Sequence, residues 1–251
     1  MFGETIAIFE KELRTMIHNP VDRVARLIRP MFWLLLFGSV IKLTNIAPGI
    51  NYQQFMLPGI LINAIVVTAV SHGITLKWEY DLGILSRLLV APVSRTAIVL
   101  GKALSCVVKA LIEGTIFLIL AWVLGIKFYP GFLTALLSAG IVGVFVIGVA
   151  SFGMVLAILL KSREAYVGIV GLIATPALFA SNSLYNFDQM PSWLQILAEI
   201  NPVTYAVDSI RRLLIYQTFD YAPLVIDVAV LVFFSLVMLA FTALIFGRSA
   251  H

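Results

Sequence analysis

The sequence predicts an all-α membrane protein with six transmembrane helices. Of its 251 residues, 61% are hydrophobic and only 12% are charged, whereas a soluble domain is about half apolar and roughly a quarter charged. This composition leaves too little polar surface to cover a water-soluble globule. The apolar runs are too long for strands that alternate every second residue, so the spans are expected to be helices rather than a barrel.

The spans follow from the apolar runs, each long enough for a helix to cross a bilayer. They are placed at residues 27–46, 54–76, 97–124, 132–160, 165–182 and 222–246. Before them, residues 1–19 carry apolar side chains at steps of three and four, which predicts a helix lying in the membrane interface. A helix packed on a partner or on the protein itself fits the same pattern. The chain, residues 1–251, is expected to form a single domain.

The basic residues predict the orientation. Six spans put both termini on one side of the membrane, and most lysines and arginines fall at that side. By the positive-inside rule both termini are cytoplasmic, with the protein in the plasma membrane of a bacterial or archaeal cell. The same rule accounts for the net charge of +4. No basic–aromatic cluster indicates a nucleic-acid partner.

Residues 79–91, between the second and third spans, predict a short cytoplasmic amphipathic helix. Its apolar face consists of Leu82, Leu85, Leu88 and Leu89. Its charges are Glu79, Asp81 and Arg87. Gly83 allows close backbone approach or a bend, and Pro92 ends the helix. A turn resting on lipid headgroups would also explain the leucines, but it fits two acidic groups beside an anionic surface less well.

Residues 183–221 predict two short external helices rather than a loop. Both segments have helical periodicity but are too short and polar to span the membrane. The pair Asn201-Pro202 separates them. We expect re-entrant helices that dip into the outer leaflet or lie on it, with Trp193 and Tyr205 at the interface.

Three sequence motifs that mark nucleotide-binding and catalytic sites are absent from the chain. There is no G-x-x-x-x-G-K-S/T loop for nucleotide phosphates, and no H-E-x-x-H or G-x-S-x-G motif. The histidines (His18, His72 and His251) are too scattered to make a metal set. The single cysteine, Cys106, excludes an internal disulfide. No catalytic, cofactor or metal site is expected in this chain.

Four polar residues within the spans are candidates for a transport route: Asn63, His72, Lys109 and Glu113. Lys109 and Glu113 are four residues apart and share a helix face. They either line a transport route or form an internal ion pair that fixes the packing of the helices. Lys109 is also close enough to the cytoplasmic surface for its ammonium to reach the headgroups. Asn63, Thr68 and His72 are spaced by five and four residues and share a face only loosely, so hydrogen bonds to a neighbouring helix are the commoner role.

Two motifs resemble those of ABC-2 type permeases. Residues 79–95, EYDLGILSRLLVAPVSR, resemble the pattern E-x-x-x-G-x-x-x-x-L-L-x-x-P-V/L-S/P-R. Residues 201–214, NPVTYAVDSIRRLL, resemble the N-P-L/V-S/T-Y-x-x-D/E-x-I/L-R signature near the last span. The signature positions are Asn201, Pro202, Tyr205, Asp208 and Arg211. The resemblance covers essentially the whole chain and is nearest to drug and lipid exporters of the daunorubicin-permease and nodulation-factor-permease type.

The resemblance implies partners that the residues alone do not. Such permeases act as dimers with two cytoplasmic ATPase subunits, which would hold the ATP and Mg. Residues 79–91 would be the coupling helix that docks on the ATPase, the N-terminal helix would make a second contact, and the external helices would cap the route. A homodimer is the default. The apolar spans favour a drug or lipid as the substrate over a polysaccharide or glycolipid. Two other functions remain alternatives: a secondary transporter or channel without an ATPase, and a scaffold subunit.

Overall fold

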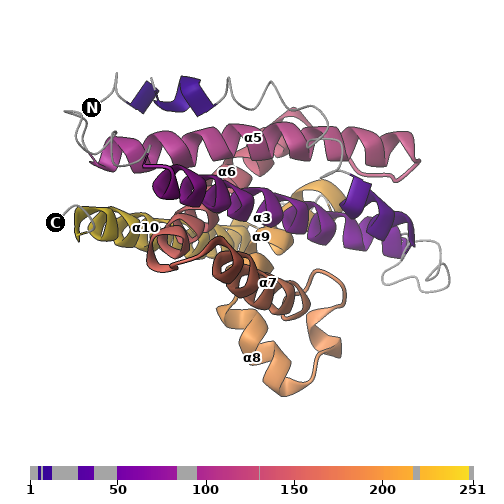
Figure 1. The fold of residues 1–251 in the computed structure, drawn as a ribbon. Helices are drawn as coiled ribbons and strands as arrows, with labels where there is room; N and C mark the ends of the chain where they lie inside the picture. Colours follow the sequence, from indigo (N-terminus) through magenta and orange to yellow (C-terminus); the bar gives the residue numbers. More distant parts are fainter. Residues whose placement is uncertain are drawn as a thin grey trace.

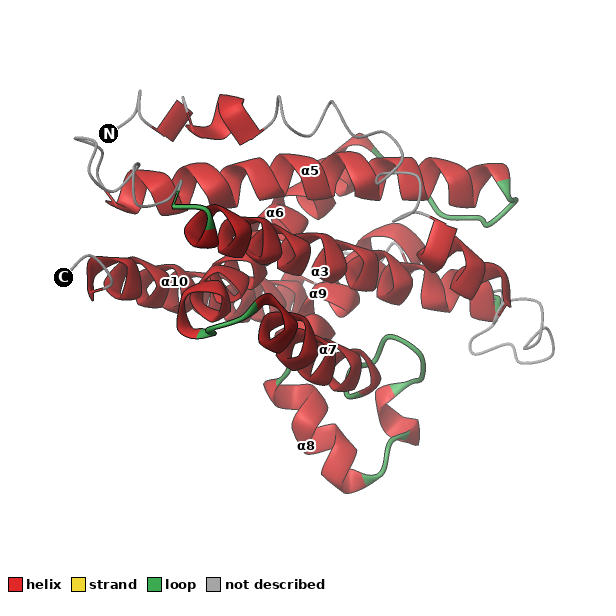
Figure 2. Cartoon of the chain, viewed as in Figure 1, coloured by secondary structure: helices red, strands yellow, loops and turns green. Residues whose placement is uncertain are grey.

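The computed structural model describes residues 5–6, 8–12, 28–36, 50–83, 95–129, 131–216 and 221–248. This part of the chain is nearly all helical and contains no strand (Figure 2). Four of its helices are long and apolar enough to cross a membrane: α3 (Tyr52–Asp81), α5 (Arg95–Val123), α6 (Phe132–Leu159) and α10 (Tyr221–Arg248). The α-helical membrane fold is therefore confirmed. Of the predicted first span, 27–46, only 28–36 is described, and it is helical.

The segment between α6 and α10 is built from short helices. α7 (Arg163–Phe179) stops before the end of the predicted span 165–182. After it come the single turn η1 (Phe187–Gln189), then α8 (Ser192–Ile200) and α9 (Pro202–Arg211), and α9 continues into a π-helical turn, η2 (Arg212–Tyr216). In Figure 1, α7 and α8 project to one side of the bundle of long helices. Two short helices flanking Asn201 are thus present, as the sequence predicts.

α3 is longer than the predicted span 54–76, and this corrects the boundary at Glu79. The helix runs unbroken through Glu79 to Asp81 because the stretch after Gly73 contains no helix breaker. An ion pair of 3.1 Å between Lys77 Nζ and Asp81 Oδ1 supports its last turn. The helix ends in a turn at Gly83, whose φ of 70° favours glycine. Glu79 and Asp81 therefore belong to α3, and residues 84–94 lie outside the described residues.

Side-chain contacts at two levels fix the helix directions. Glu113 on α5 bonds Thr68 of α3, and Lys102 on α5 pairs with Glu79 of α3, so these helices are antiparallel. A short connection, 124–131, then returns α6 alongside α3. Hydrogen bonds to α6 from Ser235 (2.6 Å, Val144 O) and Thr242 (3.0 Å, Ser151 O) show that α10 runs parallel to it. α3 and α6 form the buried centre, while α5 and α10 expose more of their surface.

The closest packing within this centre occurs at Gly73. A Cβ at this position would lie 2.7 Å from the carbonyl oxygen of Gly153 on α6 and would also meet the Tyr166 hydroxyl of α7. Tyr166 is fully buried, and its hydroxyl donates to the carbonyl of Val70 at 2.8 Å. Small residues let helix backbones approach in this way. Gly73 therefore joins α3, α6 and α7.

Gly73→Ala is expected to destabilise the protein by about 1–3 kcal/mol, the usual cost of overpacking, because the obstructing Gly153 carbonyl is backbone and cannot rotate away. Thermal unfolding of the detergent-solubilised protein measures the effect. Gly140→Ala is the matched control, since a Cβ there meets nothing within 4 Å. Equal unfolding temperatures for the two variants would contradict this account of the packing.

Candidate functional site

Charged side chains of the described residues gather near the two ends of α3. Near its first turns lies the Arg211 cluster, which we define as Phe55, Asn182, Asp208 and Arg211. Near its last turn lies the Lys102 cluster, which consists of Glu12, Glu79 and Lys102. α3 is the only element that contributes to both clusters within the described part of the chain.

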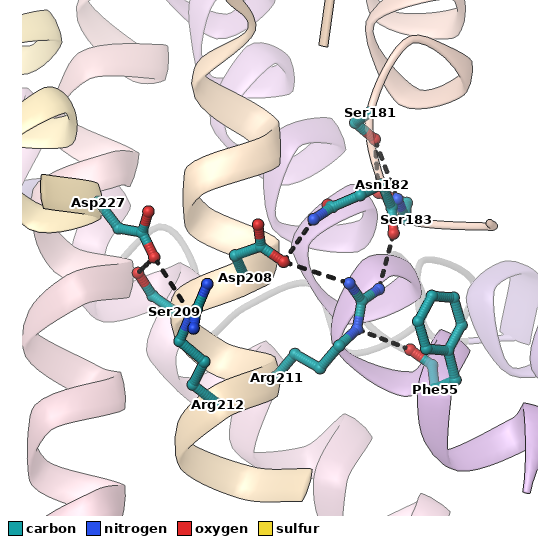
Figure 3. A network of polar contacts seen from close by, with 9 residues as sticks. All are labelled: Phe55, Ser181, Asn182, Ser183, Asp208, Ser209, Arg211, Arg212 and Asp227. Atoms are coloured by element: carbon teal, nitrogen blue, oxygen red, sulfur yellow. Dashed lines mark hydrogen bonds and ion pairs between the residues drawn. The ribbon is translucent and has the colours of Figure 1, made fainter. Parts of the chain in front are cut away.

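Arg211 is buried and fully engaged (Figure 3). Its Nε donates to the carbonyl oxygen of Phe55 at 3.3 Å, and its Nη2 donates to the carbonyl oxygen of Asn182 at 2.7 Å. Its Nη1 lies 3.4 Å from Asp208 Oδ1, and the guanidinium stacks 3.9 Å from the centre of the Phe55 ring. The planar fork of arginine suits such a multiple contact, which fixes α9 to α3 and to the segment after α7.

Other contacts surround this cluster and hold the opposite side of α9. The amide Nδ2 of Asn182 donates to the Asp208 carboxylate. Ser209 Oγ donates to Asp227 on α10 at 3.4 Å, and Arg212 Nε lies 3.8 Å from the same carboxylate (Figure 3). α9 is thus attached to three neighbours: α3, the α7–η1 connection and α10. A shift of α9 relative to any of these neighbours would strain a contact that involves a charged side chain.

Asn201 joins α7 to α9. Its side-chain oxygen accepts from Val203 N at 3.0 Å, which caps α9, while its Nδ2 donates to the carbonyls of Ala177 (2.6 Å) and Ala180 (2.9 Å). Pro202 occupies the first turn of α9, where its missing N–H is not needed. Tyr205 donates its hydroxyl to Glu199 O of α8 at 2.5 Å. The five signature positions predicted from sequence are therefore placed within one structural unit.

The Lys102 cluster lies at the opposite end of α3. The Lys102 side chain is 1% exposed, and its Nζ lies 2.6 Å from both Glu12 Oε1 and Glu79 Oε2. Burial opposes ionisation of Glu12, but the neighbouring positive charges, above all the Lys102 ammonium, together outweigh it and lower the pKa of the Glu12 carboxyl. Lys11 Nζ lies 3.2 Å from Glu79 Oε1 at the surface. The N-terminal segment, α3 and α5 thus meet at one buried cation.

Asp81 connects the end of α3 to the start of α7. Its carboxylate pairs with Lys77, and with Arg163 Nε at 3.1 Å. The Arg163 guanidinium also lies 4.1 Å from the centre of the Trp78 ring. Glu79 and Asp81, predicted to contact an ATPase, are therefore both held by cations of this chain. Leu82 is exposed beside the Gly83 turn.

The remaining residues of the predicted coupling helix, Leu85, Arg87, Leu88 and Leu89, lie outside the described residues. Their role as an ATPase contact stays a prediction.

The four predicted route residues lie in the α3–α5 layer but do not form one cluster. Glu113 is buried and accepts a hydrogen bond from Thr68 of α3 rather than from Lys109 on its own helix. His72 is buried one turn further along α3, and Asn63 is half-buried. No group of three or more potential metal ligands occurs among the described residues.

Sequence reasoning missed the partners of the signature residues. Lys102 is not among the residues singled out from the sequence, although a lysine one or two turns inside an apolar run is a signal for a buried ion pair. Asn182, a polar residue at the end of an apolar run, carries a similar signal. The carbonyl of Phe55 carries none, since every residue has one.

The family model described as ABC-2 type transporter matches residues 3–215. The chain belongs to the ABC-2 type transporter family. The match includes both motifs from which the resemblance was inferred, and an ABC ATPase partner goes with membership of this family.

Curated relatives of this ABC-2 transporter are named as permeases. A putative transport permease of Cyanophora paradoxa is 30% identical over 224 residues, 87% of this chain and 75% of the relative. A daunorubicin resistance ABC transporter permease protein of Streptomyces coeruleorubidus is 26% identical over 197 residues, 78% of this chain and 70% of the relative. A probable doxorubicin resistance ABC transporter permease protein of Mycobacterium tuberculosis is 25% identical over 214 residues, which are 83% of this chain and 76% of the relative.

Proposed function

We propose that this chain is the membrane-spanning permease subunit of an ATP-binding cassette exporter that moves an apolar drug-like or lipid-type molecule out of the cytoplasm or inner leaflet. The family match over residues 3–215 is the observation that carries the proposal. The relatives named for daunorubicin and doxorubicin resistance support a drug-like substrate. The apolar composition of the long helices supports an apolar substrate.

The proposed assembly is a homodimer of residues 1–251 with two cytoplasmic ATPase subunits, which would hold ATP and Mg while this chain performs no catalysis. Six spans with cytoplasmic termini in the plasma membrane are part of the proposal. The antiparallel α3 and α5 and the parallel α6 and α10 support it. In this topology the Lys102 cluster is cytoplasmic and the Arg211 cluster is external.

The continuous α3 helix supplies a mechanism for coupling. It rises roughly 1.5 Å per residue, so Phe55 and Asp81 are about 40 Å apart along the helix axis. Closure of the ATPases would push on the segment after Gly83, and α3 would carry the displacement as a rigid rod to the Phe55–Arg211 contact. α9 would then shift with respect to α10 and open the external side. In this mechanism, the position of α3 before ATPase closure keeps the external side closed, and its position after closure opens that side.

Reconstitution of the purified permease with its ATPase tests the proposed function. Vesicles are supplied with a fluorescent anthracycline or with a fluorescent phospholipid. We expect ATP-dependent movement of at least one of them and a substrate-dependent change in ATPase rate. Transport driven by an ion gradient without the ATPase would identify a secondary transporter instead. A bound ATPase whose rate responds to neither compound, with no transport, would identify a scaffold subunit.

Arg87→Glu and Glu79→Gln are expected to have different effects. Arg87→Glu reverses a charge at the proposed ATPase contact and should lower permease-stimulated ATPase turnover about tenfold, the equivalent of roughly 1.4 kcal/mol of contact energy. It should leave the unfolding temperature of the isolated permease unchanged. Glu79→Gln weakens the pair with Lys102 and should lower the unfolding temperature as well. Normal turnover in the Arg87 variant would refute the coupling role of this segment.

A further inference from the structure

A cavity of about 480 Å³ opens on the side of the bundle between α5 and α6. Its floor is buried and consists of α3, α9 and η2, represented by Ile65, Ile210 and Leu214. Its mouth is formed by side chains that are largely exposed, such as Trp122 near the end of α5. The volume lies within the range of about 300–1,000 Å³ that is usual for ligand pockets.

The chemistry of the cavity selects an apolar occupant. Among the residues that line it, hydroxyl side chains occur only at Thr115 and Ser138. The Thr115 hydroxyl already donates to the carbonyl of Leu111 at 2.7 Å. An ordered water needs two to four polar partners, so the cavity is unsuited to water. α5 and α6 are both long and apolar enough to span a membrane, so a mouth between them would open onto lipid.

The loop after α5 gives one end of the cavity a polar rim. Phe128 lines the cavity, and Lys127 beside it is exposed. Two contacts fix this loop: Gln54 Nε2 donates to Lys127 O at 2.8 Å, and Tyr129 N donates to Leu214 O at 3.0 Å. Tryptophans such as Trp122 mark the headgroup level of a bilayer. A lysine at that level is placed to meet a phosphate.

We propose that this cavity binds one acyl chain of a membrane phospholipid, with the lipid phosphate at Lys127. The inference goes beyond the proposed export function and does not depend on an ATPase. It has a structural consequence, since Ile210 and Leu214 flank Arg211 on the same helical segment. A bound chain would contact α9 and η2 beside Arg211.

Photolabelling of the full-length permease tests the proposal. The protein is reconstituted in vesicles of phosphatidylethanolamine and phosphatidylglycerol, with trace phosphatidylglycerol carrying a diazirine at the end of one acyl chain. After illumination, mass spectrometry locates the labelled peptides. We expect label concentrated on residues 110–122 and 135–142, which contain the lining positions of α5 and α6.

Two filling variants and one rim variant discriminate the site from general lipid contact. Ala139→Phe fills the cavity and should lower labelling about tenfold, while Gly140→Phe, one residue away and directed into open space, should leave it unchanged. Lys127→Ala should lower labelling of the same peptides severalfold.

Equal labelling of both phenylalanine variants, or label spread evenly over α5, α6 and α10, would show annular lipid only and overturn the proposal. An Ala135→Cys variant that forms disulfide-linked dimers in the membrane would assign the mouth to a second copy of the chain and would overturn it too.

Discussion

Arg211→Met is expected to abolish ATP-dependent transport and to lower the free energy of unfolding strongly. Methionine keeps much of the volume but leaves the Asp208 carboxylate and the carbonyls of Phe55 and Asn182 without their cationic donor. Breaking a buried charged contact by removing one partner costs about 3–5 kcal/mol. Thermal unfolding in detergent and transport in reconstituted vesicles measure the two effects.

The adjacent arginine supplies the matched control. The Arg212 side chain is 29% exposed and lies 3.8 Å from Asp227, so Arg212→Met should cost no more than about 1 kcal/mol, as for a partly exposed ion pair. Arg211→Lys should rescue only part of the loss, because an ammonium does not match three acceptors in the plane of a guanidinium. If both methionine variants unfold at the same temperature, the Arg211 cluster does not hold α9.

Lys102→Met is expected to release the N-terminal segment from the bundle and to uncouple the permease from its ATPase. The substitution leaves Glu12 and Glu79 facing each other without the cation that neutralises both. Their repulsion, added to their burial, favours separation of the segment around Glu12 from α3 and α5. Limited proteolysis should then cleave the N-terminal segment severalfold faster, and permease-stimulated ATPase turnover should fall.

Two further variants isolate the cause. Lys11→Met removes a lysine that is 51% exposed and pairs with the same Glu79, and it should have little effect. The triple variant Glu12→Gln, Glu79→Gln and Lys102→Met removes all three charges of the cluster and should restore protease resistance, because no buried charge is left unpaired there. Rapid cleavage of the triple variant would show that packing of the Lys102 stem, rather than its charge, holds the segment.

The sequence predicts the long helices well because a single physical signal dominates them. The predicted spans 97–124 and 132–160 agree closely with α5 and α6, since each is a long, mainly apolar run with turn residues near its ends. The end of α7 is less predictable. Its last carbonyls are capped by Asn201, which is distant in sequence and separated from α7 by α8. The end of α3 depends likewise on ion pairs with Lys102 and Arg163.

For each contact of the candidate site, the sequence predicts one of the two partners but not the other. The signature at Asn201–Arg211 identifies α9, but Arg211 binds two backbone carbonyls, and backbone groups carry no sequence signal. Glu79 illustrates the opposite problem. An acidic residue near an amphipathic segment is equally consistent with a contact to another protein and with a contact within the chain. Only the fold shows that Lys102 pairs with Glu79.

The position of Arg211 in the chain has a consequence for biogenesis. The groups that receive its guanidinium belong to Phe55, Asn182 and Asp208, all of which are synthesised before it. Chains begin to fold from the N-terminal side during synthesis. When Arg211 leaves the ribosome, its acceptors have therefore already been made. In the proposed topology, the cation could then pair with them instead of crossing hydrocarbon unpaired. A deletion that removes Phe55 or Asn182 would remove part of that acceptor site before Arg211 is made.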